Sequence, residues 1–459
     1  MATAGVLVAA IVVAAQTRSG SEPAGAGQLS AAAKAPPYRV SGDNRSQQAK
    51  DIAKRRSAAL RAGNLSAWLA DIDASAAPLI AREKMRFANL RLLRPNIFDL
   101  LPHDVLAGAY ITGDTNVEQA SVQEIMRLPG DLQRSATTAT WTINFAGPRP
   151  TITAITPGGN DYTASYAVHQ PPWDDVPLRV ARSRGITIAA PAGSLWNPAA
   201  YLPAAQRAAA TVRAMWGKRI AVPGFVVFLA NENQYTTWYD DGGDLDGSAG
   251  FTAFPPVVEA DGRGRFPRHN PNPLHEPGEP GWIERAAGSR IVLNMNEPIN
   301  GQDVQSVLTH EFGHGIAPHL IEAKRAELGP PGTSTQAIWP IEGFARWVES
   351  LDNPGRAVNA MRTVRNGKSE YQPKNTLFPG SDDFYSNDPG RRSFNYNLSS
   401  SLFLAAAQTG GRQKAVDLYI CLTNAREFVT ETRPFIDVCV KGVGLDSDKL
   451  WAKQQRLTQ

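Results

Sequence analysis

Two histidines and a glutamate within five residues are the side chains best suited to chemistry in this sequence. His310 and His314 stand four positions apart, and Glu311 directly follows the first histidine. On a helix this spacing places both imidazoles on one face, one turn apart. Two neutral imidazoles can then share one divalent ion, while the carboxylate reaches the attacking water as a base. Because the motif is short, a surface helix with two solvated histidines is the alternative interpretation.

A catalytic zinc ion needs a third protein ligand, which must come from elsewhere in the chain. The metzincin pattern fails, because His319 is out of step with it, and Glu322 would point past the metal. Glu342 lies near the start of a second predicted helix. If that helix packs across the first, it delivers a carboxylate to the metal. The alternative is an ordinary glutamate at a helix N-terminus, favoured there by the helix dipole.

Residues 342–347, Glu-Gly-Phe-Ala-Arg-Trp, resemble the second active-site helix of the gluzincins, the peptidase MA clan. That helix reads Glu-Gly-Phe/Leu-Ala-x-Tyr/Trp in the family. The resemblance covers residues 220–425 and is carried by this motif and His-Glu-x-x-His. It implies one zinc ion per chain, held by His310, His314 and Glu342, with Glu311 as the base that activates water. It also implies that Glu349 supports a ligand from behind.

The resemblance implies a further group that stabilises the oxyanion, because gluzincins use a downstream tyrosine or histidine for this. Tyr396 opens a predicted apolar helix that is similar to the third active-site helix of the family, and it is the first candidate. Tyr385 is the second. The alternative for Tyr396 is a tyrosine capping a buried helix with its hydroxyl in water.

One departure from the family bears on the substrate. The M1 aminopeptidases carry a Gly-x-Met-Glu-Asn strand that binds a free substrate amine, and this chain has none. The expected activity is therefore that of an endopeptidase acting on peptides or proteins. The alternative function is a non-catalytic or degenerate metallopeptidase-like binding protein of the cell envelope.

The elements that must position these residues follow an α+β order. Expected helices over 46–71 and 80–93 precede short expected strands, which indicates a small α+β domain over residues 46–170 that is similar in pattern to an NTF2-like cone. His103 and His169 are isolated there and are interpreted as structural or solvated. The strands of this domain are expected over 105–112, 122–128 and 137–145.

Residues 171–459 are expected to form a thermolysin-like gluzincin domain with a mixed sheet and active-site helices. The apolar run 224–230 predicts a central strand. A Pro- and Gly-rich loop over 261–288 holds His269 and His275, and is expected to overhang the cleft. The other strands are expected over 178–181, 185–190, 249–254 and 290–296, and helices over 204–216, 394–409, 414–425 and 432–440.

The N-terminus indicates export. An uncharged apolar run over 4–15 suits a signal peptide and is short for a membrane span, so residues 1–18 are expected to be a signal peptide or membrane anchor, and 19–45 a flexible linker. The alternative is a disordered Ala-rich tail. The protein is therefore expected outside the cytoplasm, either secreted or tethered to the membrane by this segment. There Cys421 and Cys439 are expected to form a disulfide, whereas in the cytosol they would be buried thiols.

The composition argues against a nucleic-acid partner and provides enough hydrophobic residues for packed cores. The net charge is +4, from 47 basic and 43 acidic residues that are interspersed along the chain. Without a basic arm or stripe there is no electrostatic case for nucleic-acid binding. The 459 residues are 42% hydrophobic, which is enough for two or three domains with packed cores.

Overall fold

The computed structural model shows an α+β protein with two sheets, as the order of the predicted elements requires. The expected linker lies outside the described residues except for its end, where Asp43 begins a helix. Most of the expected export segment, and the candidates His169, His269, His275, His319 and Glu322, lie outside them too. The described residues are 8–10, 43–107, 116–157, 171–217, 224–239, 248–255, 258, 287–296, 304–316, 338–424 and 431–459.

An antiparallel four-stranded sheet, in the order β2-β3-β4-β5, follows three helices. The expected single helix over 46–71 is two helices, because Gly63 takes a φ of +71° between them, a left-handed conformation that glycine adopts without strain. The helices are α1 (Asp43–Ala62), α2 (Leu65–Leu69) and α3 (Ala77–Leu93). The strands are β2 (Ile97–Ala107), β3 (Val117–Arg127), β4 (Ser135–Asn144) and β5 (Thr151–Pro157).

The first strand of this sheet begins earlier than expected, at Ile97 rather than Val105. Pro102 lies inside it, at a register shift in the pairing with β3. A proline is tolerated there because β2 is an edge strand and the shift is a bulge, where no ladder hydrogen bond is lost. The sequence pattern therefore placed the start of this strand too late, because a proline is unusual inside a strand.

A mixed six-stranded sheet has the order β1-β9-β10-β8-β7-β6. The apolar run is β8, a central strand as predicted, parallel to β10 and β7. Val8–Ala10 of the expected export segment forms β1, which pairs in parallel with β9. The strands are β1 (Val8–Ala10), β6 (Leu178–Ser183), β7 (Ile186–Pro191), β8 (Phe225–Ala230), β9 (Ser248–Ala253) and β10 (Arg290–Asn294).

Both faces of the six-stranded sheet are buried. Phe225, Val227 and Leu229 of β8 pack in one core with α5 (Pro198–Trp216) and α7 (Val304–Ile316). The alternate residues Val226 and Phe228 join a second core, which continues into the four-stranded sheet. The short helices α4 (Pro172–Asp175) and α6 (Glu232–Thr237) contribute to this second core. One continuous apolar core therefore connects the two sheets.

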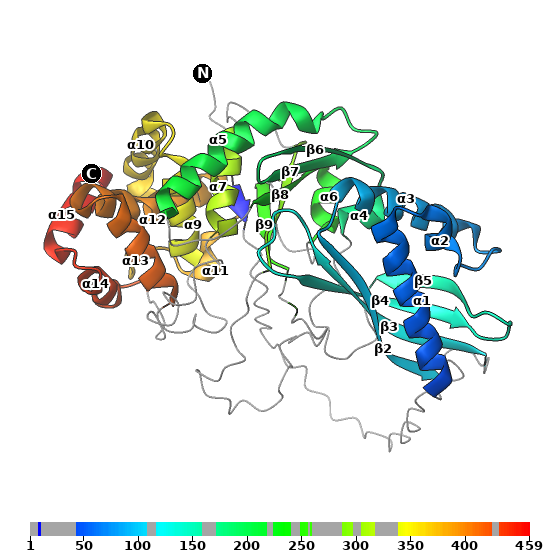
Figure 1. Ribbon diagram of the computed structural model, residues 1–459. Helices are drawn as coiled ribbons and strands as arrows, with labels where there is room; N and C mark the ends of the chain where they lie inside the picture. The colour runs from blue at the N-terminus through cyan, green and yellow to red at the C-terminus, as the bar shows by residue number, and fades with distance from the viewer. Residues whose placement is uncertain are drawn as a thin grey trace, which may run out of the picture.

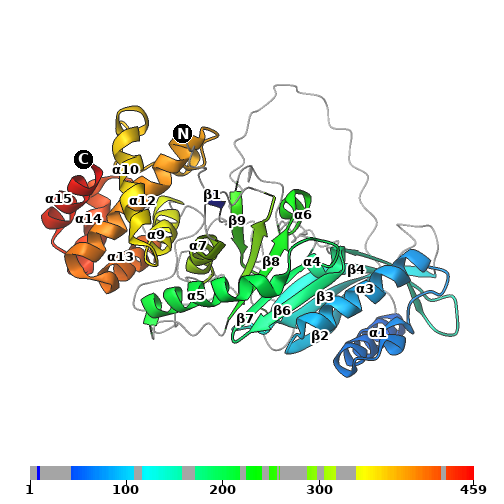
Figure 2. The same cartoon turned by 90° about the horizontal axis from the view of Figure 1, so that it is seen from above.

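The remaining helices gather around α12 (Pro389–Gly410), at the opposite end of the molecule from α1 (Figures 1 and 2). The expected disulfide is present, and Cys421–Cys439 joins α13 to α14. Among the described residues, no helix has the length and apolar character needed to cross a bilayer. The helices are α9 (Ile338–Glu349), α10 (Pro354–Tyr371), α11 (Ser381–Phe384), α13 (Arg412–Asn424), α14 (Arg433–Gly442) and α15 (Ser447–Thr458).

A buried ion pair ties the β3–β4 turn to the strand that precedes α7. Arg290, the first residue of β10, donates from both terminal nitrogens to Asp131, over 2.5 and 2.8 Å. Both side chains are almost fully buried. Gly288 makes room for the pair, since a Cβ there would lie 2.0 Å from an Asp131 oxygen. The four-stranded sheet thus holds one end of β10.

We expect Asp131→Ala to lower the free energy of unfolding by about 3–5 kcal/mol, because it leaves the buried Arg290 guanidinium without its counter-charge. The matched control is Asp99→Ala, which breaks an ion pair with Arg61. In that pair the Asp99 side chain is 46% exposed and the Arg61 side chain 52%. This control should cost at most about 1 kcal/mol. Urea unfolding followed by tryptophan fluorescence measures both. Equal losses would show that the buried Asp131–Arg290 pair stabilises the fold no more than the exposed pair does.

Candidate metal centre

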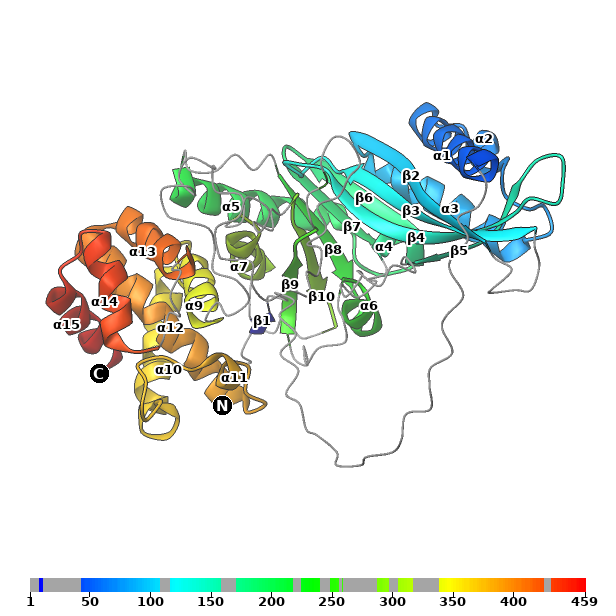
Figure 3. The ribbon, with the colours of Figure 1, turned by 90° about the horizontal axis from the view of Figure 1, so that it is seen from below.

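Helix α7 carries His310, Glu311 and His314, and all three side chains are buried. The helix is fixed to the sheet by Phe312, whose ring stacks on Phe225 of β8 at a centroid distance of 3.9 Å. Figure 3 shows α7 between α5, α9 and β9. The helical spacing predicted from the sequence is therefore realised, and the alternative of a solvated surface helix is wrong, because no part of the motif is exposed.

Helix α9 brings Glu342 to the histidines. The glycine that follows it has a steric role: a Cβ at Gly343 would lie 2.6 Å from the backbone and Cβ of Ser399. Only glycine permits this close approach of α9 and α12. The same contact fixes the position of Tyr396 relative to α9, because Tyr396 lies on α12 almost one turn before Ser399. One small residue in the motif therefore positions two helices at the site.

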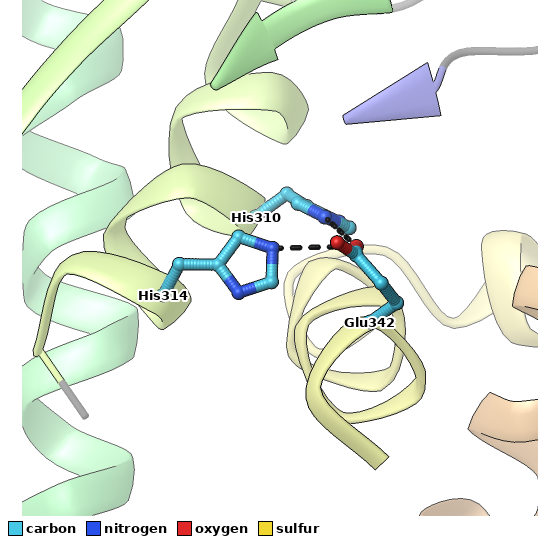
Figure 4. Close-up of side chains that lie close together, drawn as sticks. All are labelled: His310, His314 and Glu342. Atoms are coloured by element: carbon cyan, nitrogen blue, oxygen red, sulfur yellow. Dashed lines mark hydrogen bonds and ion pairs between the residues drawn. The ribbon is translucent and has the colours of Figure 1, made fainter. Parts of the chain in front are cut away.

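Three candidate ligand atoms converge (Figure 4). Glu342 Oε2 lies 3.3 Å from His310 Nε2 and 3.4 Å from His314 Nε2, and all three ligand atoms lie within 4.8 Å of one another. Zinc bonds of about 2.0–2.1 Å at tetrahedral angles would place neighbouring ligand atoms about 3.3 Å apart. In the described part of the chain no other group of His, Cys, Asp or Glu side chains is arranged to hold a metal.

Burial and mutual contacts shift the pKa values of all three candidate ligands. Burial opposes ionisation of Glu342, but the two histidines outweigh it and lower its pKa to about 2. Burial also opposes the charged form of His310, yet hydrogen bonds with Glu342 and Glu349 raise its pKa to about 9. For His314 burial prevails, and the pKa is lowered. A histidine must be neutral to bind a metal, so metal binding at this site would release the proton of His310.

Glu349 lies behind His310, with Oε2 3.5 Å from Nδ1. Burial opposes its ionisation, but Arg346, which donates to both carboxylate oxygens over 2.7 Å, and His310 hold the pKa of this carboxyl well below its usual range. Arg356 at 2.9 Å and the Ser306 hydroxyl at 2.5 Å complete the set of donors. Sequence reasoning identified Glu349 and missed these partners, of which only Arg346 had a local signal, the i,i+3 spacing.

Glu311 is oriented by β9. The Thr252 hydroxyl lies 2.8 Å from Glu311 Oε2 and 3.2 Å from the Glu311 carbonyl oxygen. Burial raises the pKa of Glu311 to about 8, and the nearby negative charges of Glu342 and Glu349 add to this. A carboxyl with a pKa near neutrality suits a group that both takes and returns a proton. Thr252 was not identified from the sequence, because it lies far away in the chain.

The two tyrosine candidates occupy different places. Tyr385 donates its hydroxyl to Glu342 Oε1 over 2.8 Å and so holds the ligand candidate from behind. Tyr396 is buried, and its ring centroid is 6.2 Å from that of His310. Burial, and then the nearby negative charges, raise the pKa of Tyr396 well above 10, so its hydroxyl keeps its proton. Its burial also rules out the alternative of a hydroxyl in water.

The candidates from α7, α9 and α12 thus meet at one place, whereas Cys421 and Cys439 lie in the helices α13 and α14. His103 belongs to β2 of the other sheet. No protein-family model and no curated protein matches the sequence.

We expect Glu342→Gln to weaken zinc binding by at least about 100-fold, because the neutral amide is a poor ligand and removes the charge that balances the ion. The matched control is Glu370→Gln, on the exposed side of α10, which should leave binding unchanged. Competition with a chromophoric chelator measures both affinities. Full zinc affinity in Glu342→Gln would exclude this residue as a ligand.

Replacing Glu349 by glutamine should lower zinc affinity by about 10- to 100-fold without abolishing it. The carboxylate accepts from the ring nitrogen of His310 that faces away from Glu342, and it compensates Arg346 and Arg356. Calorimetric titration of the metal-free protein measures the change. An affinity equal to that of wild type would mean that Glu349 serves the packing of the arginines alone.

Proposed function

We propose that this protein is a zinc-dependent peptidase of gluzincin type. The single observation that carries the proposal is the convergence of His310, His314 and Glu342, with Glu311 beside them on the same helix. The resemblance of the two sequence motifs to those of gluzincins supports it. An arrangement serving structure alone would need no further carboxylate, oriented and buried, next to the ligands.

Zinc is the metal that this set of donors favours. Two imidazoles and one carboxylate leave a fourth position open, which is the arrangement of catalytic rather than structural zinc sites. Calcium and magnesium prefer six or more oxygen ligands, and copper(I) prefers sulfur. The donor separations of 3.3 and 3.4 Å match a tetrahedral centre.

A peptide is the substrate that the surroundings favour. In this structure β9, the strand next to the site, pairs on its outer side with the extended segment Val8–Ala10. That edge therefore accepts another main chain, which is how peptides are often bound. A disulfide between α13 and α14 agrees with action outside the cytoplasm, since such bonds persist in oxidising compartments.

The residues divide the reaction between them. A bound zinc ion supplies Lewis acidity that polarises a peptide carbonyl and makes a water more acidic. Glu311 takes a proton from the attacking water and passes it to the leaving amine. Tyr396, protonated and buried beside His310, donates to the oxyanion. Tyr385 keeps Glu342 oriented through its hydrogen bond.

The competing function is a non-catalytic binding protein of the cell envelope that retains a metal site. It requires the same three ligands but gives Glu311 no task. Burial opposes the charged form of Glu311, so a buried carboxylate without a function would only cost folding free energy. The presence of this carboxylate at the site favours the enzyme.

We expect Glu311→Gln to bind zinc as wild type does but to lose about 10²- to 10⁴-fold in kcat, because the amide cannot accept the proton. A peptide library followed by mass spectrometry measures cleavage, and metal analysis measures zinc. Glu370→Gln is again the matched control and should stay active. A wild-type protein that holds zinc and cleaves no peptide would favour the binding protein, and one that holds no zinc would contradict both.

A further inference from the structure

Strand β9 presents two residues to the base on α7. Side chains two positions apart on a strand face the same way, so Gly250 and Thr252 both face Glu311. The Thr252 side chain is fully buried, and its hydroxyl lies closer to the carboxylate oxygen Oε2, at 2.8 Å, than to the carbonyl, at 3.2 Å. A hydroxyl has one hydrogen to donate, and the nearer acceptor, Glu311 Oε2, is the better one.

The two oxygens of Glu311 are thereby made unequal. Oε2 accepts from Thr252, whereas Oε1 is buried and has no hydrogen-bond partner within the part of the chain that the structure describes. A buried acceptor without a partner is costly, so its persistence calls for a ligand that would satisfy it. The donor that the proposed reaction brings to this place is the attacking water.

Gly250 leaves room beside that oxygen. A Cβ on this residue would lie 3.1 Å from Glu311 Oε1 and 3.2 Å from its Cγ, which is tighter than nine in ten Cβ contacts in proteins. The neighbour on the other side is Leu293 of β10, whose Cδ2 would also be 3.1 Å away. An alanine would therefore push against the carboxylate at the oxygen that has no partner.

We propose that Thr252 and Gly250 are positioning residues for Glu311. Thr252 fixes the carboxylate through Oε2, Gly250 leaves room at Oε1, and Oε1 is the oxygen that accepts the proton. This inference rests on the proposed peptidase function and adds to it which atom acts and what orients it. Neither residue belongs to the two sequence motifs.

The test compares Thr252→Val, which keeps the shape and loses the hydroxyl, with Thr252→Ser, which keeps the hydroxyl. We expect the valine variant to lose about 10- to 100-fold in kcat with little change in KM or zinc content, because the base is no longer held in place. The serine variant should recover most of the activity. Thr187→Val, at a buried position of β7, is the control for the substitution itself.

Gly250→Ala tests the second residue, with Gly193→Ala as its control, since a Cβ there meets nothing within 4 Å. We expect only Gly250→Ala to lower kcat, by about 10-fold or more, with zinc retained. Wild-type kcat in Thr252→Val, or equal losses in Thr252→Val and Thr252→Ser, would overturn the role of the hydroxyl. Wild-type kcat in Gly250→Ala would overturn the role of the open space.

Crystal structures of the zinc-loaded wild type and Thr252→Val separate this inference from the peptidase proposal, because they need no activity. We expect one carboxylate orientation of Glu311 in the wild type, with Oε2 on Thr252, and a turned or divided orientation in the variant. An unchanged Glu311 in Thr252→Val would overturn the inference even if the protein is a peptidase. A wild type without activity would overturn the peptidase proposal alone.

Discussion

The buried contact of one carboxylate with two imidazoles is the constraint on which the rest of the site depends. Glu342 Oε2 faces His310 and His314, and all three residues are at most 2% exposed. A buried carboxylate is stable as an ion only beside positive charge or a metal. The surrounding helices supply the rest, with Tyr385 on the second oxygen of Glu342 and Glu349 behind His310. The cluster is therefore a continuous chain of polar contacts in an apolar core.

The scaffold makes this burial possible by fixing helices on both sides of the cluster. Phe312 stacks on Phe225 and holds α7 to the central strand, and Gly343 lets α12 approach α9. The four-stranded sheet contributes through Asp131, which holds Arg290 at the start of β10. Because β9 pairs with β10, the same support reaches Thr252 and the base. The two sheets thus act on the site together through one continuous core.

Part of the fold and of the site could be predicted from local sequence spacing. Contacts between residues far apart in the chain could not. The α+β order, the central strand β8 and the pairing of the two cysteines follow from periodicity, apolar runs and composition. His310 and His314 follow from the helical repeat, and Glu342 required a second motif. Thr252, Ser306 and Arg356 left no such signal, because each meets its partner only after the chain has folded.

Local sequence patterns also misplaced or missed some secondary-structure elements. Pro102 hid the start of β2, since its tolerance depends on an edge position that the sequence does not display. Helix α10 was not predicted, because its buried face consists only of Ala360, Met361 and Val364, and Gly367 interrupts its pattern. The close contact of Gly367 with Phe394 explains the glycine in the folded chain, where a Cβ would lie 2.9 Å from that ring.

The most direct measurement of the central claim is an anomalous difference map at the zinc absorption edge, from crystals of the protein grown with zinc. The arrangement of His310, His314 and Glu342 predicts one strong peak within about 2.0–2.2 Å of both Nε2 atoms and of a Glu342 oxygen. No peak there, or a zinc ion bound elsewhere while Glu342 keeps its contacts with the two histidines, would contradict it.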